Sequence, residues 1–320
     1  MRFLLRRLVH AGFLLVGVSV LSFLLLQLAP GEFFEEMKLN PQISPQTIAA
    51  LRAQFGLDRP IGVRYVRWLQ SAARGDFGYS FAYNSPVAPL LIARARNTAI
   101  LAGVSTLIAW LLALGLGIWS AARAGRWDDR LCAGIMSVSL ALPDVLLALV
   151  LLLFAVRTGA FPVGGMVSNS FADLSFSQKL LDIGSHMALP VLALVLGLLP
   201  ALVRHVRSAV ATALSAPCIN AARAHGITPA RLLFRHVLPL AANPLISLFG
   251  VSLATLLSVS LLVEVIMSWP GLGPFFLEAI LARDVYVVIG TVLLSTTFLV
   301  AGNLIADGLL YAVDPRIRSK

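Results

Sequence analysis

Positively charged side chains interrupt the apolar sequence in the stretch NAARAHGITPARLLFRHVLP, residues 220–239. A guanidinium group binds carboxylates and phosphates through several hydrogen bonds at once, so this stretch is suited to recognising an anionic surface. That surface is either the headgroup layer of a membrane or the face of a protein partner. The basic side chains concerned are Arg223, His225, Arg231, Arg235 and His236.

The same stretch predicts two short helices joined by an elbow. Asn220 to His225 is typical of a helix end, and Gly226 follows where helices commonly turn left-handed. Thr228 is placed to cap a second helix that begins at Pro229. The pair fits an amphipathic hairpin on the inner lipid surface. It also fits a rigid knob that docks on a cytoplasmic partner, because small alanine side chains permit close approach.

Three carboxylates lie in or near apolar segments, where an ionised group is costly and is therefore a candidate for function. Glu264 precedes Trp269–Gly271 near the outer end of its segment, so it belongs either to an outer gate or to the headgroup interface. Asp144 is expected inside a helix, where it lines a polar pathway or pairs with a basic group. Asp307 is expected to fasten the last helix.

Hydroxyl side chains recur at every third position in one apolar segment, at Ser252, Thr255 and Ser258. At about 100° per residue they stay within roughly 120° of one helix face. They fit the lining of a translocation path, and they fit helix packing equally well, because small hydroxyl residues are common between membrane helices.

Catalytic and cofactor motifs are missing from the sequence. It contains no His-Glu-x-x-His zinc helix and no Gly-x-Ser-x-Gly elbow. The lysines Lys38, Lys179 and Lys320 lie in no glycine-rich loop that would cradle phosphates. We therefore expect no catalytic residues, no bound metal and no cofactor on this chain. An intramembrane enzyme that uses Asp144 or a histidine is a minor alternative.

The elements that position these residues are long apolar helices. Hydrophobic residues make up 58% of the 320 residues, charged residues make up 12%, and the mean hydropathy is +0.88. About 20 helical residues cross a bilayer, so the sequence predicts an all-α membrane protein with six transmembrane helices. The predicted spans are Leu8–Ala29, Thr98–Ala121, Leu131–Val156, Met187–Val203, Pro244–Met267 and Val287–Leu310.

Arginines concentrate in alternate short loops, so the positive-inside rule places both termini in the cytoplasm. The long loop after the first helix forms an extracytoplasmic subdomain between helices 1 and 2, with helices expected at Ser44–Gly56 and Ile61–Ala73. The predicted parts are residues 1–29, a signal-anchor helix; 30–97, the extracytoplasmic loop; 98–311, a five-helix core with the cytoplasmic loop 204–243; and 312–320, a cytoplasmic tail.

Several motifs in this order resemble the permease subunits of ABC importers, and most closely the branch that serves dipeptides, oligopeptides and nickel. The resemblance covers essentially the whole chain. The sequence departs from the family pattern at Asn220, where a Glu is usual, and at His236, where an Ile is usual. The motifs are AARAHG at 221–226, RHVL at 235–238 with Pro244, FGLDRPIGVRYVRWL and RGDFGYSF in the first loop, Pro86–Leu101 with Arg94 and Thr98, VEVIMSWPGLG at 263–273, and the tail with Asn303, Asp307, Tyr311 and DPRIR.

The resemblance implies an alternating-access permease of the bacterial inner membrane, with peptides as the first candidate substrate and nickel chelates or sugars still open. It implies four kinds of partner: a second homologous permease, two cytoplasmic ATPase subunits that use ATP and Mg²⁺, an extracytoplasmic substrate-binding protein and membrane lipid. No nucleic-acid partner is expected, because the sequence contains no basic patch interleaved with aromatic residues. An ion-gradient-driven secondary transporter is the alternative. The implied ATPase-coupling residues are Ala222, Arg223, Gly226, Thr228, Pro229, Arg231, Arg235 and His236, and the outer gate comprises Glu264, Trp269, Pro270 and Gly271.

Overall fold

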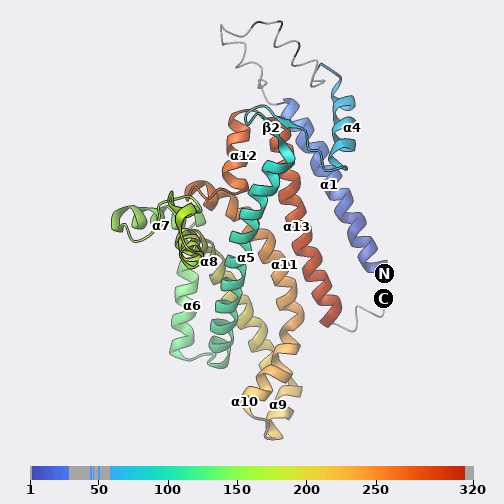
Figure 1. Ribbon diagram of the computed structural model, residues 1–320. Helices are drawn as coiled ribbons and strands as arrows, with labels where there is room; N and C mark the ends of the chain where they lie inside the picture. The colour runs from blue at the N-terminus through green and yellow to red at the C-terminus, as the bar shows by residue number, and fades with distance from the viewer. Residues whose placement is uncertain (1, 29–43, 45, 47–49, 51–57, 314–320) are drawn as a thin grey trace. The chain divides into compact units, whose positions relative to one another are not determined.

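The computed structural model describes residues 2–28, 44, 46, 50 and 58–313, and it is built of long helices (Figure 1). Contacts divide the chain into two compact units. One combines Met1–Asn97 with Pro270–Phe298, and the other combines Thr98–Trp269 with Leu299–Lys320. Two helices, α5 (Val87–Ala122) and α13 (Val285–Val313), contribute to both units.

The first unit contains helices and one small antiparallel hairpin. Its core is aromatic: Trp68 is buried and packs against Phe23, with ring centroids 5.8 Å apart, and Ile289 joins the same cluster. The indole N–H of Trp68 donates to the Phe77 carbonyl at 3.1 Å. Besides its parts of α5 and α13, the elements are α1 (Arg2–Leu28), α4 (Ile61–Ala72), β1 (Tyr79–Ser80), β2 (Ser85–Pro86) and α12 (Leu272–Leu281).

The predicted helix at 61–73 is confirmed by α4, whereas the predicted helix at 44–56 lies mostly outside the described residues. The aromatic cluster joins α4 to α1 and α13. Residues of the long first loop therefore pack on the apolar helices next to them.

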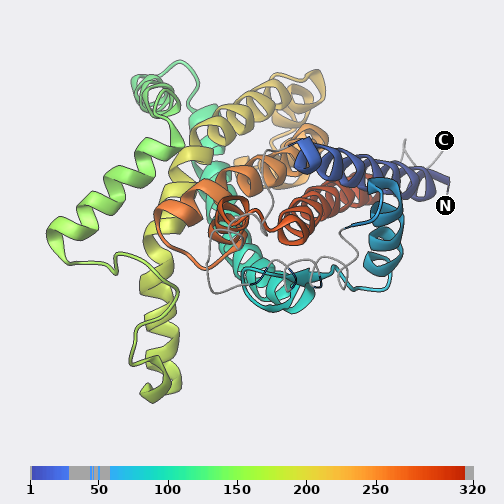
Figure 2. The same cartoon turned by 90° about the horizontal axis from the view of Figure 1, so that it is seen from above.

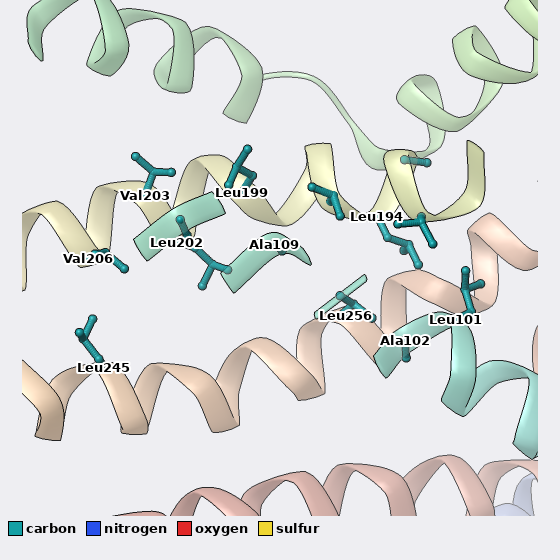
Figure 3. Packing of buried hydrophobic residues seen from close by; sticks show 14 of the residues in the cluster. Leu101, Ala102, Ala109, Leu194, Leu199, Leu202, Val203, Val206, Leu245 and Leu256 are labelled. Atoms are coloured by element: carbon teal, nitrogen blue, oxygen red, sulfur yellow. The ribbon is translucent and has the colours of Figure 1, made fainter. Parts of the chain in front are cut away.

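The second unit is a helical bundle around α8, whose apolar side chains share one buried cluster with those of α5 and α11 (Figure 3). On α5 the small residues Ala109 and Ala113 are fully buried, and a Cβ on Gly117 would lie 2.6 Å from Val206. Small residues allow the two backbones to approach closely, as is usual between membrane helices. The elements are α6 (Trp127–Leu140), α7 (Asp144–Thr158), the 3₁₀ turn η1 (Phe171–Asp173), α8 (Phe176–Leu214), α9 (Pro217–Ala224), α10 (Pro229–Leu232), the π-helical turn η2 (Leu233–Val237) and α11 (Leu238–Ile266).

Among the described residues, five helices are long and apolar enough to cross a membrane, or six if α6 and α7 form one span. The prediction of an all-helical membrane protein is confirmed, with the two-residue strands as a local exception. The helices are generally longer than their predicted spans; α5, for example, begins at Val87, before Thr98, and α8 has 39 residues.

The prediction that Leu131–Val156 is one continuous helix was wrong, because α6 and α7 meet at 92°. Figure 2 looks along α6 and shows α7 lengthwise. Pro143 explains the break, since it has no N–H to donate and it drives Leu142 away from helical geometry. Asp144 therefore lies in the first turn of α7, not in the interior of a helix as predicted.

Candidate functional site

The elbow between α9 and α10 forms as its residues predict. Gly226 has φ +76°, a left-handed conformation that favours glycine, and its N–H donates to the Arg223 carbonyl at 3.0 Å. Thr228 occupies the cap position, and its carbonyl accepts the N–H of Leu232 at 2.8 Å, but its hydroxyl makes no capping hydrogen bond. Pro229 is the first helical residue, as expected.

The second helix of the elbow is not short, which corrects the prediction. From Pro229 the helix continues through η2 and α11 as one stretch of 38 residues ending at Ile266. A π-helical turn inserts an extra residue without ending a helix. The elbow is therefore the end of a membrane-length helix, and a force on it acts directly on that helix.

Three buried side chains anchor the elbow to the bundle: Ile219, Leu232 and Val237. Figure 1 shows α9 and α10 at one end of the second unit, beyond α8 and α11. Of the predicted coupling residues, Ala222 and His236 are half-buried and the others are exposed, namely Arg223, Gly226, Thr228, Pro229, Arg231 and Arg235.

Phe234 is an exposed aromatic residue that sequence reasoning missed. Its side chain is 69% exposed, in the same turns as the exposed Arg231 and Arg235. Helical spacing gave only part of the signal, because it places Phe234 about 200° from the buried Leu232. The same spacing would place Val237 about 140° from Leu232, so the burial of both depends on the π-helical turn between them. Exposed aromatic and arginine side chains are the residue types that most often dominate protein interfaces.

Glu264 is fully buried at the end of α11, so the alternative of a carboxylate reaching headgroup water is wrong. Trp269 is also fully buried, and its backbone N–H donates to the backbone carbonyl of Glu264 at 2.9 Å. Between them Ser268 has φ +51°, and its carbonyl accepts the N–H of Gly165 from the loop before α8 at 3.2 Å. The loop contact was not predicted, because nothing local in the sequence signals it.

Pro270 and Gly271 belong to the other unit, so the predicted gate residues do not fall in one compact body. The side-chain amide of Asn97 donates to the Pro270 carbonyl at 2.8 Å. Gly271 is buried and immediately precedes α12.

The three hydroxyls of α11 have different surroundings. Ser252 is buried and accepts a hydrogen bond from the indole N–H of Trp110 at 3.0 Å. Thr255 and Ser258 are exposed, and each donates to a carbonyl one turn earlier in its own helix. Ser252 therefore packs between helices, whereas Thr255 and Ser258 are on a face that the described part of the chain leaves exposed.

Asp144 lies against α8 at a glycine. A Cβ placed on Gly197 would overlap the Oδ1 atom of Asp144, so only glycine accommodates the carboxylate there. No basic side chain of the described residues forms an ion pair with Asp144, so the predicted pairing is not observed.

A buried ion pair that the sequence did not reveal joins α6 to α8. The Nε and an Nη atom of Arg207 each donate to Asp129 at 2.7 Å. The same carboxylate accepts the Ser120 hydroxyl at 2.5 Å and the Gly125 N–H at 2.9 Å. Four donors therefore satisfy a side chain that is only 2% exposed. The pair fastens the turn between α5 and α6 to α8.

In the first unit another buried carboxylate, that of Asp284, holds the hairpin. It accepts the Ser80 hydroxyl at 2.6 Å and the Ala82 N–H at 3.2 Å. In the same hairpin the Tyr83 hydroxyl donates to Glu278 of α12. Burial, followed by this hydrogen bond, raises the pKa of Tyr83 to about 12.

Among the described residues no three His, Cys, Asp or Glu side chains are grouped so that they could hold a metal ion. The arrangement supplies instead an exposed cationic elbow and several buried carboxylates.

Comparison with known families identifies the class of protein. Residues 113–319 match the model described as binding-protein-dependent transport system inner membrane component, and residues 1–102 match the model for the N-terminal part of such proteins. The chain belongs to this family. The permease is thus a multi-pass protein of the bacterial inner membrane.

Curated relatives match the permease over its full length. It is 34% identical over 317 residues to the oligopeptide transport system permease protein AppB of Bacillus subtilis (strain 168), covering 98% of both chains. It is 32% identical over 339 residues to the dipeptide transport system permease protein DppB of Escherichia coli (strain K12), covering 100% of this chain and 99% of the relative.

A solved structure of the MetNI methionine ABC transporter in an inward-facing conformation has the same fold. The TM-score is 0.54 at 22% identity, over 70% of the permease and 96% of the matched chain. At this identity the likeness concerns the fold alone.

Proposed function

We propose that the permease is the membrane-spanning subunit of an ATP-driven importer of peptides. Full-length similarity to permeases named for oligopeptides and dipeptides supports the substrate class. The observation that carries the mechanism is the continuity of the elbow with α11, because it gives a partner a direct mechanical connection to a membrane-length helix.

In this proposal the chain has six spans, with α6 and α7 counted as one broken span, and both termini lie in the cytoplasm. The distribution of arginines supports this orientation. The segment between α1 and α5 then lies outside, where an extracytoplasmic binding protein delivers substrate.

The elbow docks on a cytoplasmic ATPase subunit. Arg231 and Arg235 supply charge and Phe234 supplies an apolar anchor, while Gly226 and Pro229 fix the angle. Two ATPase subunits bind ATP with Mg²⁺, one on this elbow and one on the elbow of a second, homologous permease. Their closure moves α11 and switches the pathway between its outward-open and inward-open states.

The outer gate comprises Glu264, Trp269, Pro270 and Gly271. Burial of Glu264 and Trp269 supports a gate that is packed shut in this conformation. Thr255 and Ser258 contribute to the pathway or to the second permease, because the chain leaves both exposed. Ser252 serves packing.

The test replaces Phe234 with alanine in the complete transport complex and measures uptake of a labelled dipeptide together with recovery of the ATPase on purification. Losing an aromatic anchor costs about 2 kcal/mol of binding, so ATPase affinity is expected to fall roughly thirtyfold and uptake to fall with it. Arg231→Glu is expected to act in the same direction.

Phe176→Ala is the matched control, because Phe176 is 80% exposed but lies at the start of α8, far along the chain from the elbow. Uptake and ATPase recovery are expected to stay normal in this variant. Equal behaviour of the Phe234 and Phe176 variants would contradict the docking role. Uptake without any ATPase, driven by an ion gradient, would contradict the importer and favour a secondary transporter.

A further inference from the structure

A cavity of about 220 Å³ lies between α5, α6 and α8, separate from the elbow and from the predicted gate. Its walls are of two kinds. One part is polar and basic, and the other is apolar. The polar walls include Ser120, Arg204 and Arg207, and the apolar walls include Met136, Leu140 and Pro200.

The two kinds of wall lie toward opposite ends of the cavity. α6 and the second half of α8 run antiparallel (Figure 1). Arg207 bonds Asp129 at the start of α6. Pro200 is seven residues earlier on α8, about 10 Å along the helix, and Leu140 is at the far end of α6. The cavity is therefore basic toward the start of α6 and apolar toward its end.

The basic end carries a positive charge that no carboxylate of residues 2–28 and 58–313 neutralises. Arg207 uses two of its N–H groups on Asp129, and their charges offset each other. Arg204 is exposed, and no acidic side chain of the described residues lies within ion-pair distance of it. An occupant with a negatively charged group would therefore find a cationic partner in Arg204 and free donors on Arg207.

Exposed tryptophans mark the level of the basic end in the membrane. Trp127 is 75% exposed at the start of α6, and Trp119 is 38% exposed near the end of α5. Indole rings concentrate at the boundary between headgroups and acyl chains. Cys132, in the cavity wall, is about 8 Å further along α6 than Trp127, and Leu140 is about 20 Å further. The cavity therefore runs from near headgroup level into the acyl layer.

We propose that this cavity binds an anionic phospholipid. Its phosphate contacts Arg204 and the free donors of Arg207, and the upper part of an acyl chain lies along Met136 and Leu140. Basic pockets between membrane helices are known to accept anionic headgroups, and the charge and polarity here follow the same order as those of the lipid. The proposal requires only that the chain is embedded in a membrane, so it is independent of the transported substrate and of docking at the elbow.

The test uses Cys132 as a reporter of occupancy. In the complete complex with Cys218→Ser, the rate of maleimide labelling at Cys132 is measured in nanodiscs of phosphatidylcholine with increasing phosphatidylglycerol of the same acyl chains. Phosphatidylglycerol is expected to protect the thiol. Arg204→Gln is expected to raise about fivefold the fraction of phosphatidylglycerol that halves the labelling rate. About fivefold is the change in binding that one arginine near an anionic surface contributes.

Arg130→Gln is the matched control, since Arg130 is an exposed arginine on α6, the helix that carries Cys132, but does not line the cavity. Protection of the thiol in this variant is expected to equal that in the wild type. Arg204→Lys keeps the charge and is expected to retain most of the protection, which separates a charge effect from misfolding. Equal loss in the Arg204 and Arg130 variants would overturn the proposal. Equal protection by phosphatidylcholine alone or by inorganic phosphate would also overturn it. A Cys132 thiol that stays shielded in the delipidated complex would overturn it as well, and would assign the cavity to a neighbouring subunit.

Discussion

At the scale of single residues, two adjacent aspartates at the start of α6 differ sharply. Asp129 is buried and bound by Arg207, whereas Asp128 pairs at 2.6 Å with Arg123, whose side chain is 46% exposed. Exposed pairs contribute little, and a buried pair that loses one partner leaves an uncompensated charge. The neighbours therefore provide an internal comparison.

We expect Asp129→Asn to lower the free energy of unfolding by about 2 kcal/mol. This is below the usual cost of breaking a buried pair, because Arg207 is partly exposed and water screens its charge. The thermal midpoint of the purified permease, followed by size-exclusion after heating, measures the effect. Asp128→Asn is the control and should shift the midpoint much less. Equal shifts would mean that the buried pair has no special role.

The pKa of Tyr83 gives a second prediction at this scale. Because its pKa rises from 10.0 to about 12 in the folded chain, the folded state holds the phenol proton more tightly than the unfolded state does. The stability that this proton contributes is fully present below pH 10 and is lost as the pH rises from about 10 to about 12. An alkaline titration of phenolate absorbance, with Tyr83→Phe as the difference reference, should show that the phenol missing from the variant ionises near pH 12. Ionisation near pH 10 would contradict the hydrogen bond to Glu278.

Residues were predictable where their signal was local. Gly226 and Pro229 were found because helix ends have characteristic residues within a few positions. Asp129 was not found, because its partner is 78 positions away, and a sequence does not show which distant residues meet. Burial of Glu264 was missed because the exposure of a side chain depends on how the whole chain folds around it, which its neighbours in sequence do not show.

At the scale of elements, the first residue after the break between α6 and α7 packs tightly against α8. The carboxylate of Asp144 lies directly over Gly197 of α8, where any Cβ would overlap it. The break is thus held from two sides, by Pro143 in its own segment and by the absence of a side chain on the facing helix.

We expect Gly197→Ala to destabilise the permease by about 1–3 kcal/mol, the usual cost of overpacking. Gly184→Ala is the control on the same helix, because a Cβ there meets nothing within 4 Å. Since alanine favours a helix more than glycine does, that control should be neutral or stabilising by up to about 1 kcal/mol. The Asp144→Ala/Gly197→Ala double variant should recover part of the loss. Thermal midpoints that fall equally in both single variants would contradict the contact.

Helices were predictable as elements, but their lengths and joints were not. Apolar windows mark only the part of a helix that faces lipid or core, so α5 and α8 extend well beyond their windows. The π-helical turn at Leu233–Val237 has no residue signature, and the continuity of α10 with α11 was therefore missed. Pro143 was visible in the sequence, yet proline also occurs inside α8 at Pro190 and Pro200 without ending it. Packing decides between a kink and a break.

At the scale of the whole molecule, composition was enough to predict a helical membrane protein, and motifs in order were enough to predict the family. Orientation depends on the arginine distribution and is open to direct measurement. Cys218 on α9 is exposed, and Asn169 is exposed in the loop on the other side of α8. The measurement uses a background with Cys132→Ser.

We expect a membrane-impermeant maleimide to label Cys218 only in inverted vesicles. Asn169→Cys, made in a background without Cys218, should be labelled only in intact spheroplasts, because α8 separates the two positions. Labelling of both from the same side would contradict the proposed course of α8 through the membrane. Labelling of each from the opposite side would reverse the orientation and remove the elbow from the reach of an ATPase.

The hydrogen bond between Ser80 and Asp284 has a consequence for how the chain is made. It joins residues that are 204 positions apart, so the hairpin leaves the ribosome long before its carboxylate partner exists. At typical synthesis rates that interval is roughly 10–40 s. During this time Ser80, Tyr83 and the aromatic residues around them lack the part of the chain against which they pack. They are accessible to proteases and chaperones on the side of the membrane where they emerge. Truncated permeases that stop before Asp284 should therefore be recognised as unfinished and removed.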